Sequence, residues 1–375
     1  MNKQPFKFGV ATSGEHFTDR EKETERLVSN FEHGINTILI SPRRWGKTSL
    51  VKKAGSLVAS KEIRVVFIDV FSCRTENEFC NTFATAVLKQ TSSRWEEWIK
   101  NAQEFLSRIS PMITLGNDPT TEMSLSIDLK GKEQSLEDVL QLPEKIAQKN
   151  NCRVVVCIDE FQQIGEFSSS LTFQKKLRTI WQHQKFVSYC LFGSKKHLMD
   201  ELFGRKDYPF YKFGDIIYLE KINTSDWISY ICERFRSTEK EISEELAECI
   251  VNTVDNHSSY VQQLSWIVWG YTEKKVSQKE LNRAIEDIIN QNRPLFEKQT
   301  EDLTAHQLNF LRAIADGIHD SYTTQDVIDK YNLNSSANAN AVKTALLKKE
   351  LIDTKDNQTF IADPVMVLWM KQYLF

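Results

Sequence analysis

The chain has 375 residues, of which 41% are hydrophobic and 26% are charged, and its formal net charge is −3. This composition is ordinary for folded globular proteins, and the length allows about two or three domains. The near balance of charges excludes a global attraction to nucleic acid or to an anionic membrane, while a local basic patch stays compatible with it. No apolar run approaches the roughly 18 residues of a membrane span, and the N-terminus lacks the apolar core of a signal peptide. We therefore expect a cytoplasmic protein without membrane contact.

The cysteines favour the same compartment. Their number is odd, and no two of them have the CxxC spacing of a metal or redox site. We interpret all of them as reduced, buried thiols rather than as disulfides or zinc ligands. They are Cys73, Cys80, Cys152, Cys157, Cys190, Cys232 and Cys249.

Apolar segments alternate with amphipathic ones up to about residue 221. The apolar segments predict buried strands over residues 36–40, 63–70, 154–159, 187–193 and 215–219. The amphipathic segments predict helices over residues 19–33, 47–59, 76–89, 136–149 and 173–184. We expect Ile35 and Leu57 to belong to the apolar sides of the first two helices. Strands that alternate with helices imply an α/β fold, in which an open parallel sheet is covered on both faces.

Residues 110–130 interrupt this alternation. Two short runs, 112–115 and 123–129, flank the turn-forming segment 116–119, which reads Gly-Asn-Asp-Pro. The second run alternates apolar with polar residues, as a half-exposed strand does. We predict a β-hairpin inserted into the α/β core.

After residue 221 the strand signals stop. Helices are predicted over residues 227–236, 243–254, 259–273 and 278–292, and together they form a helical lid. Pro294 biases Arg293 away from the helical conformation, so we place a domain boundary there. Three further helices, over 304–316, 324–331 and 335–349, precede a hairpin at 351–362, which is typical of a winged helix-turn-helix. The predicted domains are a core over 1–221, a lid over 222–293 and a winged-helix domain over 294–375.

The loop after the first predicted strand has the phosphate-binding pattern GxxxxGK[ST]. Gly46, Lys47 and Thr48 match it, with Ser41 in the position of the first glycine. The backbone N–H groups of such a loop surround the phosphates, and the following helix adds a favourable dipole. We expect Lys47 to contact the β- and γ-phosphates and Thr48 to bind Mg²⁺. The predicted nucleotide-binding residues here are Ser41, Pro42, Arg43, Arg44, Trp45, Gly46, Lys47, Thr48 and Ser49.

Three large side chains crowd this loop, those of Arg43, Arg44 and Trp45. They are candidates to contact the γ-phosphate, another subunit or the winged-helix domain. The alternative is that Arg44 and Trp45 only pack the loop onto the lid.

Two acidic residues end the apolar strand predicted over 154–159. Asp159 is expected to hold Mg²⁺, directly or through water. Glu160 is placed to act as the general base that polarises an attacking water molecule. Alone, such a pair would be an ordinary solvated strand end. Together with the phosphate loop it predicts a hydrolytic ATP·Mg²⁺ site.

These motifs resemble those of the bacterial and archaeal ATPases of the AAA+/STAND division that end in a winged helix. The matching segments are Phe8-Gly9, Gly14, Phe17–Glu21, Ser41–Leu50, Val156–Gln162, Phe192–Ser194, Pro209–Tyr211, His257–Leu264 and Asp363-Pro364. The resemblance covers nearly the whole chain. It implies a P-loop NTPase fold with an AAA+-like parallel sheet, a helical lid and a C-terminal winged helix-turn-helix. It also implies ATP and Mg²⁺ as cofactors, bound between core and lid.

The resemblance implies further roles for single residues. Ser194 matches the sensor position that monitors the γ-phosphate, and Phe17 and Arg20 match a segment near the adenine. Arg205 is the candidate arginine finger and therefore a catalytic candidate beside Glu160, Lys47 and Ser194. Its alternative role is a surface salt bridge.

The predicted winged helix raises the question of its partner. Asn338, Asn340, Lys343 and Lys348 on its third helix are candidates to contact DNA. However, residues 301–375 contain seven basic and ten acidic residues, a net charge of −3. Because DNA affinity depends largely on phosphate neutralisation by basic residues, the composition favours a protein partner or self-association.

The sequence therefore predicts a slow, partner-dependent ATPase that acts as a molecular switch, binding ATP or ADP and relaying its nucleotide state to the winged helix. A DNA-binding ATPase is one alternative. A nucleotide-binding scaffold with negligible hydrolysis is the other.

Overall fold

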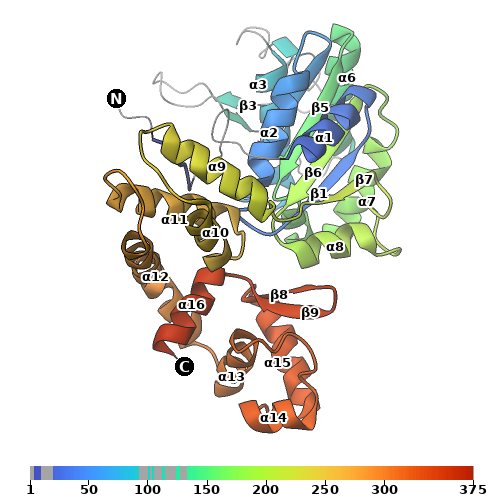
Figure 1. Ribbon diagram of the computed structural model, residues 1–375. Coiled ribbons are helices and arrows are strands. Elements are labelled where there is room, and N and C mark those ends of the chain that lie inside the picture. Colours follow the sequence, from blue (N-terminus) through green and yellow to red (C-terminus); the bar gives the residue numbers. More distant parts are fainter. Residues whose placement is uncertain are drawn as a thin grey trace. The chain divides into compact units, whose positions relative to one another are not determined.

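The computed structural model describes residues 4–9, 20–92, 100–101, 104, 112–114, 124–126 and 133–374 (Figure 1). The chain divides into two compact units. The sheet unit is Asp19–Glu220, and the helical unit combines Met1–Thr18 with Lys221–Phe375. No helix in the described part of the chain has both the length and the apolar character needed to cross a membrane.

A five-stranded sheet with the order β2-β5-β6-β1-β7 forms the centre of the sheet unit. Every neighbouring pair of strands is parallel, as the alternation of strands and helices predicts. The strands are β1 (Thr37–Ile40), β2 (Ile63–Asp69), β5 (Arg153–Asp159), β6 (Val187–Gly193) and β7 (Asp215–Tyr218). Since β6 lies between β5 and β1, the carboxyl ends of these three strands are neighbours at one edge of the sheet.

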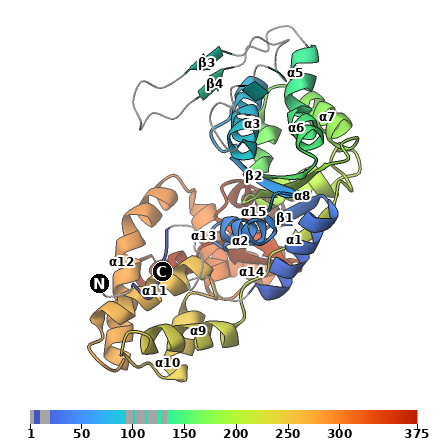
Figure 2. The same ribbon diagram turned by 90° about the horizontal axis from the view of Figure 1, so that it is seen from above.

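Helices cover both faces of this sheet, and Figure 2 shows α1 and α2 on the side opposite to α3, α6 and α7. On the second side, Val66, Val156 and Leu191 of the strands join one hydrophobic cluster with residues of these helices. Within it, the rings of Trp181 and Tyr189 stack with centroids 4.0 Å apart. The described helices are α1 (Glu21–His33), α2 (Lys47–Val58), α3 (Glu76–Thr91), α5 (Glu133–Leu140), α6 (Leu142–Asn150), α7 (Ser170–Trp181) and α8 (Lys196–Gly204), with the 3₁₀ helix η2 (Phe161–Glu166).

Several local predictions for this unit are wrong. Gly34 ends α1 in the left-handed conformation, so Ile35 lies beyond the helix and is exposed. Leu57 lies on the outer side of α2 and is also exposed. The helix expected over 136–149 is two helices, because Pro143 occupies the first turn of α6 and starts a new helix there. Helix α8 was not predicted.

The predicted hairpin insert is described only in part. Strands β3 (Met112–Thr114) and β4 (Ser124–Ser126) pair antiparallel, as a hairpin requires. The remainder of the segment 110–130 lies outside the described residues.

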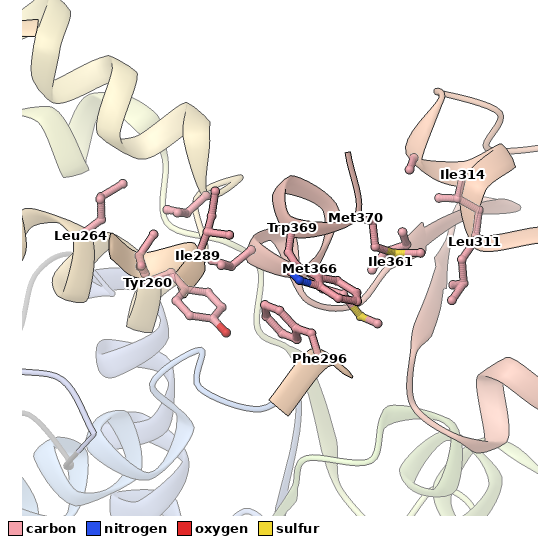
Figure 3. Close-up of a cluster of buried hydrophobic side chains, with 14 of the residues drawn as sticks. Tyr260, Leu264, Ile289, Phe296, Leu311, Ile314, Ile361, Met366, Trp369 and Met370 are labelled. Carbon is pink, nitrogen blue, oxygen red and sulfur yellow. The ribbon is translucent and has the colours of Figure 1, made fainter. Parts of the chain in front are cut away.

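The helical unit has one continuous hydrophobic core. In it, Tyr260 and Leu264 of α11, Ile289 and Phe296 of α12, and Trp369 of α16 belong to the same cluster (Figure 3). The elements are α9 (Thr224–Arg236), α10 (Glu244–Thr253), α11 (Ser258–Tyr271), α12 (Gln278–Glu301), α13 (Ala305–Ala315), α14 (Gln325–Tyr331), α15 (Ser336–Lys348), β8 (Ile352–Lys355), β9 (Gln358–Ile361) and α16 (Pro364–Tyr373). Three helices and a hairpin are present as predicted, but α16 was not predicted.

Helix α12 corrects the expectation that the chain leaves the helical conformation at Arg293. It runs through Pro294 without ending. Proline removes one helical hydrogen bond, but buried residues on both sides hold the helix: Ile288 and Ile289 before the proline, Phe296 and Thr300 after it. The local bias of a pre-proline residue is overridden here by tertiary packing. The division of this unit into a lid and a winged-helix domain therefore crosses a continuous helix.

The cysteines differ from expectation at one position. All seven are unpaired, five are buried and Cys232 is half-buried, but Cys249 is exposed. The inner face of α10 is formed by Ala247, Ile250 and Val251, and the helical period places Cys249 on the outer face.

Replacing Phe296 with Ala tests whether the shared core holds the helical unit together. Phe296 is fully buried, and its ring lies 5.7 Å from that of Trp369. Truncation should lower the free energy of unfolding by about 3–5 kcal/mol, because it leaves a cavity. The neighbouring Leu295 is 46% exposed, so Leu295→Ala, the matched control, should change it by no more than about 0.5 kcal/mol. Urea denaturation followed by circular dichroism measures both, and similar values for the two variants would contradict the role of the shared core.

Candidate active site

The loop between β1 and α2 has the form of a phosphate-binding loop. Gly46 is the N-cap of α2 and has φ 91°, a conformation that favours glycine. No side chain of the described residues caps this helix, and its first turn contains no acid. The N-terminus of α2 is therefore free to direct its N–H groups and its dipole at an anion.

Lys47 lies inside this loop. Its Nζ donates hydrogen bonds to the carbonyl oxygens of Ser41 and Pro42, both at 3.0 Å, and the side chain is 6% exposed. Burial lowers the pKa of Lys47 to about 8, and the nearby carboxylates of Glu160 and Asp159 only partly oppose this shift. An ammonium group that is short of compensating negative charge is a favourable partner for a phosphate.

Asp159 connects the loop with the end of β5. Thr48 Oγ1 donates to Asp159 Oδ2 at 2.8 Å. Burial raises the pKa of Asp159 to about 6, and this rise persists although the Thr48 hydroxyl favours the charged form. A hydroxyl and a desolvated carboxylate in direct contact are the hard oxygen donors that Mg²⁺ prefers. The two predicted metal ligands thus lie together and fit this cation.

Glu160 adopts an unusual backbone conformation beside Asp159. Its φ is 54°, in the left-handed region, where a residue other than glycine costs about 1–2 kcal/mol. Its Oε2 accepts hydrogen bonds from Ser194 Oγ at 2.8 Å and from Ser194 N at 3.4 Å. It also accepts one from Gln162 Nε2. The candidate general base is therefore held by the residue that follows β6 and by the turn after β5.

Arg43 extends this hydrogen-bonded group. Its Nε donates to Ser194 Oγ at 3.3 Å, and the side chain is exposed. Arg44 is exposed and has φ 64°, Trp45 is half-buried and Ser49 is buried. Ser194 thus lies between Arg43 and Glu160 and joins the phosphate loop to the candidate base.

Two other predicted site residues form ion pairs with acids outside this group. Arg205 follows α8 and pairs with Asp207 at 2.6 Å and with Glu201 at 3.2 Å, so the structure gives it the surface salt bridges of its alternative role. Arg20 is buried at the N-cap of α1 and pairs with Glu23 at 3.0 Å. The position of Phe17 lies outside the described residues.

One residue of the group was not predicted. Gln162 contacts Glu160 directly, yet sequence periodicity does not distinguish it from the adjacent Gln163, which is equally buried. The signals that could have indicated it are its position two residues after Glu160 and its place at the end of the family-like segment Val156–Gln162.

Two family models match the chain. One is described as "ATPase domain predominantly from Archaea" and matches residues 17–216, more than half of the chain. The other is described as "Probable winged helix domain" and matches residues 294–372. No curated protein matches.

Solved structures of ATPases have a similar fold. A Walker-type ATPase of Pyrococcus abyssi matches with a TM-score of 0.69 at 18% identity, covering 98% of this chain and 99% of that chain. The ORC2 protein of Aeropyrum pernix, in its ADPNP-ADP complexes, matches with a TM-score of 0.59 at 14% identity, covering 99% and 97%. Its ADP form gives 0.53 at 14% identity, covering 94% and 93%. The predicted fold class, a P-loop ATPase sheet with a C-terminal winged helix, is confirmed.

Replacing Asp159 with Asn tests the buried charge in nucleotide-free protein kept in a chelator. The folded pKa of about 6 exceeds the ordinary value of 3.8, so the carboxylate destabilises the fold at pH 7, and this effect fades as the pH falls toward 4. Asp159→Asn should therefore raise the free energy of unfolding at pH 7 by on the order of 1–3 kcal/mol. The gain should disappear near pH 4.

Thermal denaturation at pH 7, 5 and 4 measures this dependence. The control is Asp69→Asn, which changes an exposed acid at the end of the neighbouring strand β2 and should give little gain at any pH. A gain for Asp159→Asn that is the same at all three pH values would contradict the buried-charge explanation.

Proposed function

The chain belongs to the family of ATPase domains found predominantly in Archaea. On this premise we propose that it binds ATP with Mg²⁺ and hydrolyses it to ADP and phosphate. The observation that carries this proposal is the hydrogen-bonded group at the ends of three neighbouring strands. It joins Thr48 to Asp159 and Ser194 to Glu160, with the buried ammonium of Lys47 beside them. The ADPNP and ADP complexes of the similar ORC2 protein support nucleotide as the ligand.

Each residue of the group has a role that follows from its chemistry. The N–H groups of the loop and the ammonium of Lys47 bind the phosphates. Thr48 and Asp159 would hold Mg²⁺, which supplies positive charge to the phosphate oxygens. Glu160 takes a proton from the water molecule that attacks the γ-phosphorus as the bond to the leaving oxygen breaks. Ser194, which contacts both Glu160 and Arg43, responds to the γ-phosphate.

Three predicted residues complete the proposed site from outside the group. Arg20, and Phe17 before it, lie near the adenine in this proposal. Arg205 acts as an arginine finger on a second copy of the chain, and its exposure on the surface of the sheet unit supports this. Its ion pairs with Asp207 and Glu201 would have to open first.

We propose that the helical unit relays the nucleotide state to a protein partner or to a second copy, as a switch of the STAND type. Its continuous core supports this, because a segment that packs as one body transmits a displacement without absorbing it. Tyr260 of α11 donates to Asp363 Oδ2 at 2.6 Å, just before α16. The unpaired thiols support action in a reducing compartment such as the cytoplasm.

The surface of α15 favours protein over DNA as the partner. Its exposed residues include Ala337, Asn340, Ala341 and Thr344, which are small and uncharged. Of the residues proposed for DNA, Asn338 donates to Leu333 O at 2.9 Å within the domain, and Lys343 lies over the ring of Tyr322. Asn340 and Lys348 are exposed.

Glu160→Gln tests hydrolysis directly. It keeps the shape of the side chain but removes the base, so ATP turnover should fall by about 10²- to 10⁴-fold while ATP affinity is retained. Phosphate release measures turnover, and a fluorescent ATP analogue measures binding. Glu166→Gln, which changes an acid paired with Lys195, should leave both unchanged. Equal rates for the wild type and Glu160→Gln would remove Glu160 from the mechanism and favour a scaffold without hydrolysis.

A duplex-DNA gel shift at low and moderate salt tests the partner. We expect no salt-dependent shift, because α15 presents few positive charges and the domain is acidic. A shift that weakens with salt and is lost in the Asn340→Ala, Lys348→Glu double variant would instead assign DNA to the winged helix.

A further inference from the structure

We propose that Gln162 is a positioning residue that holds the carboxylate of Glu160 in one orientation. We also propose that residue 193 is a glycine because a larger residue would displace the side chain of Gln162. This inference rests on the proposed function, in which Glu160 is the general base. It assigns a role to a residue outside the phosphate loop and the two acidic ligands.

The hydrogen bonds to Glu160 are divided unequally between its two oxygens. Every hydrogen bond donated to its side chain by described residues falls on Oε2, from Ser194 and from Gln162. A carboxylate oxygen has about two lone-pair sites, so Oε2 is saturated. Oε1 is left to accept the proton of the attacking water molecule.

Two residues from different elements hold that one oxygen with three donor groups. Ser194 follows β6, and Gln162 lies in η2 after β5. A carboxylate held by one donor can still rotate about its terminal torsion, which has a broad energy minimum. The second donor, from another direction, removes this freedom and fixes which oxygen faces the reactants.

Gly193 makes room for the carboxamide of Gln162. A Cβ at residue 193 would lie 1.8 Å from Gln162 Oε1 and 2.9 Å from Met199 Sδ. Gly193 does not have a positive φ, so its backbone alone does not demand glycine. The requirement is steric, and it is imposed mainly by Gln162, with a smaller contribution from the flexible side chain of Met199.

The carboxamide of Gln162 does not use all of its hydrogen-bonding groups in this position beside Gly193. Gln162 is 2% exposed, and its Oε1 is buried without a hydrogen-bond partner among the described residues. A buried acceptor without a partner weakens the fold, and an apolar side chain of similar length would avoid this. The glutamine is therefore explained by the one hydrogen bond that its side chain makes with a described residue, which goes to Glu160.

Gln162→Met tests the role, because methionine keeps the length and volume but cannot donate. We expect kcat for ATP hydrolysis to fall about 10- to 100-fold, the scale of a misplaced catalytic group, with KM and ATP-analogue affinity unchanged. The melting temperature should not fall, because the unpaired acceptor is removed. A residue with only a structural role would lower the melting temperature and leave kcat unchanged.

Gln163→Met is the matched control. Gln163 is the adjacent residue, is also buried, and donates to Glu166 at 3.0 Å instead of to Glu160. It should leave kcat unchanged. Equal kcat for Gln162→Met, Gln163→Met and the wild type would overturn the proposal.

A double-mutant cycle tests whether Gly193 acts through Gln162. Gly193→Ala should lower kcat in the wild type, because its methyl group displaces the carboxamide. In a Gln162→Ala background it should cause little further loss, because the closest colliding side chain is gone and only the flexible side chain of Met199 has to shift. Additive losses would overturn the role of Gly193. If the wild type does not hydrolyse ATP, both the proposed function and this inference are overturned. If it does, and the Gln162 variants hydrolyse ATP at the same rate, only the inference is overturned.

Discussion

The hydrogen bond from Thr48 to Asp159 joins two segments that are 111 residues apart in the chain, and the candidate site is organised around it. It forms because β5 and β1 are separated by a single strand, β6, so that their carboxyl ends lie at the same edge of the sheet. The same arrangement places Ser194, which follows β6, between them. In open parallel sheets this edge is where ligands bind.

Several features of the site each cost stability. Lys47 is buried and Asp159 is half-buried there, and their pKa values are displaced in opposite directions, to about 8 and about 6. In both cases burial is the largest cause, because each charge has lost more water than its neighbours replace. Glu160 adopts a left-handed backbone, and Gln162 has an unpaired buried acceptor. Such local costs are typical of sites that are stabilised by their ligand.

The helical unit is organised differently, by one hydrophobic core. Helix α16 returns after the β8–β9 hairpin, and its Trp369 packs on Phe296 of α12 (Figure 3). Helix α12 itself continues through the position at which the family model of the winged helix begins. The residues before and after Pro294 therefore share one helix and one hydrophobic core.

The fold class could be predicted from the sequence alone, and so could the residues that we propose to bind phosphate and Mg²⁺. Gly46-Lys47-Thr48 and Asp159-Glu160 were recognisable because phosphate and cation binding restrict residue types within short segments, and buried parallel strands are continuous apolar runs. Four features could not be predicted and became visible only in the folded chain: the order of the strands, the partners of Arg205, the path of α12 through Pro294 and the packing of Gln162 against Gly193. These features depend on contacts between residues distant in the chain, such as the 1.8 Å approach that excludes a side chain at Gly193. The pattern of residues within a short segment does not specify such contacts. The local conformations open to a segment differ little in energy, so packing against distant residues decides which of them forms.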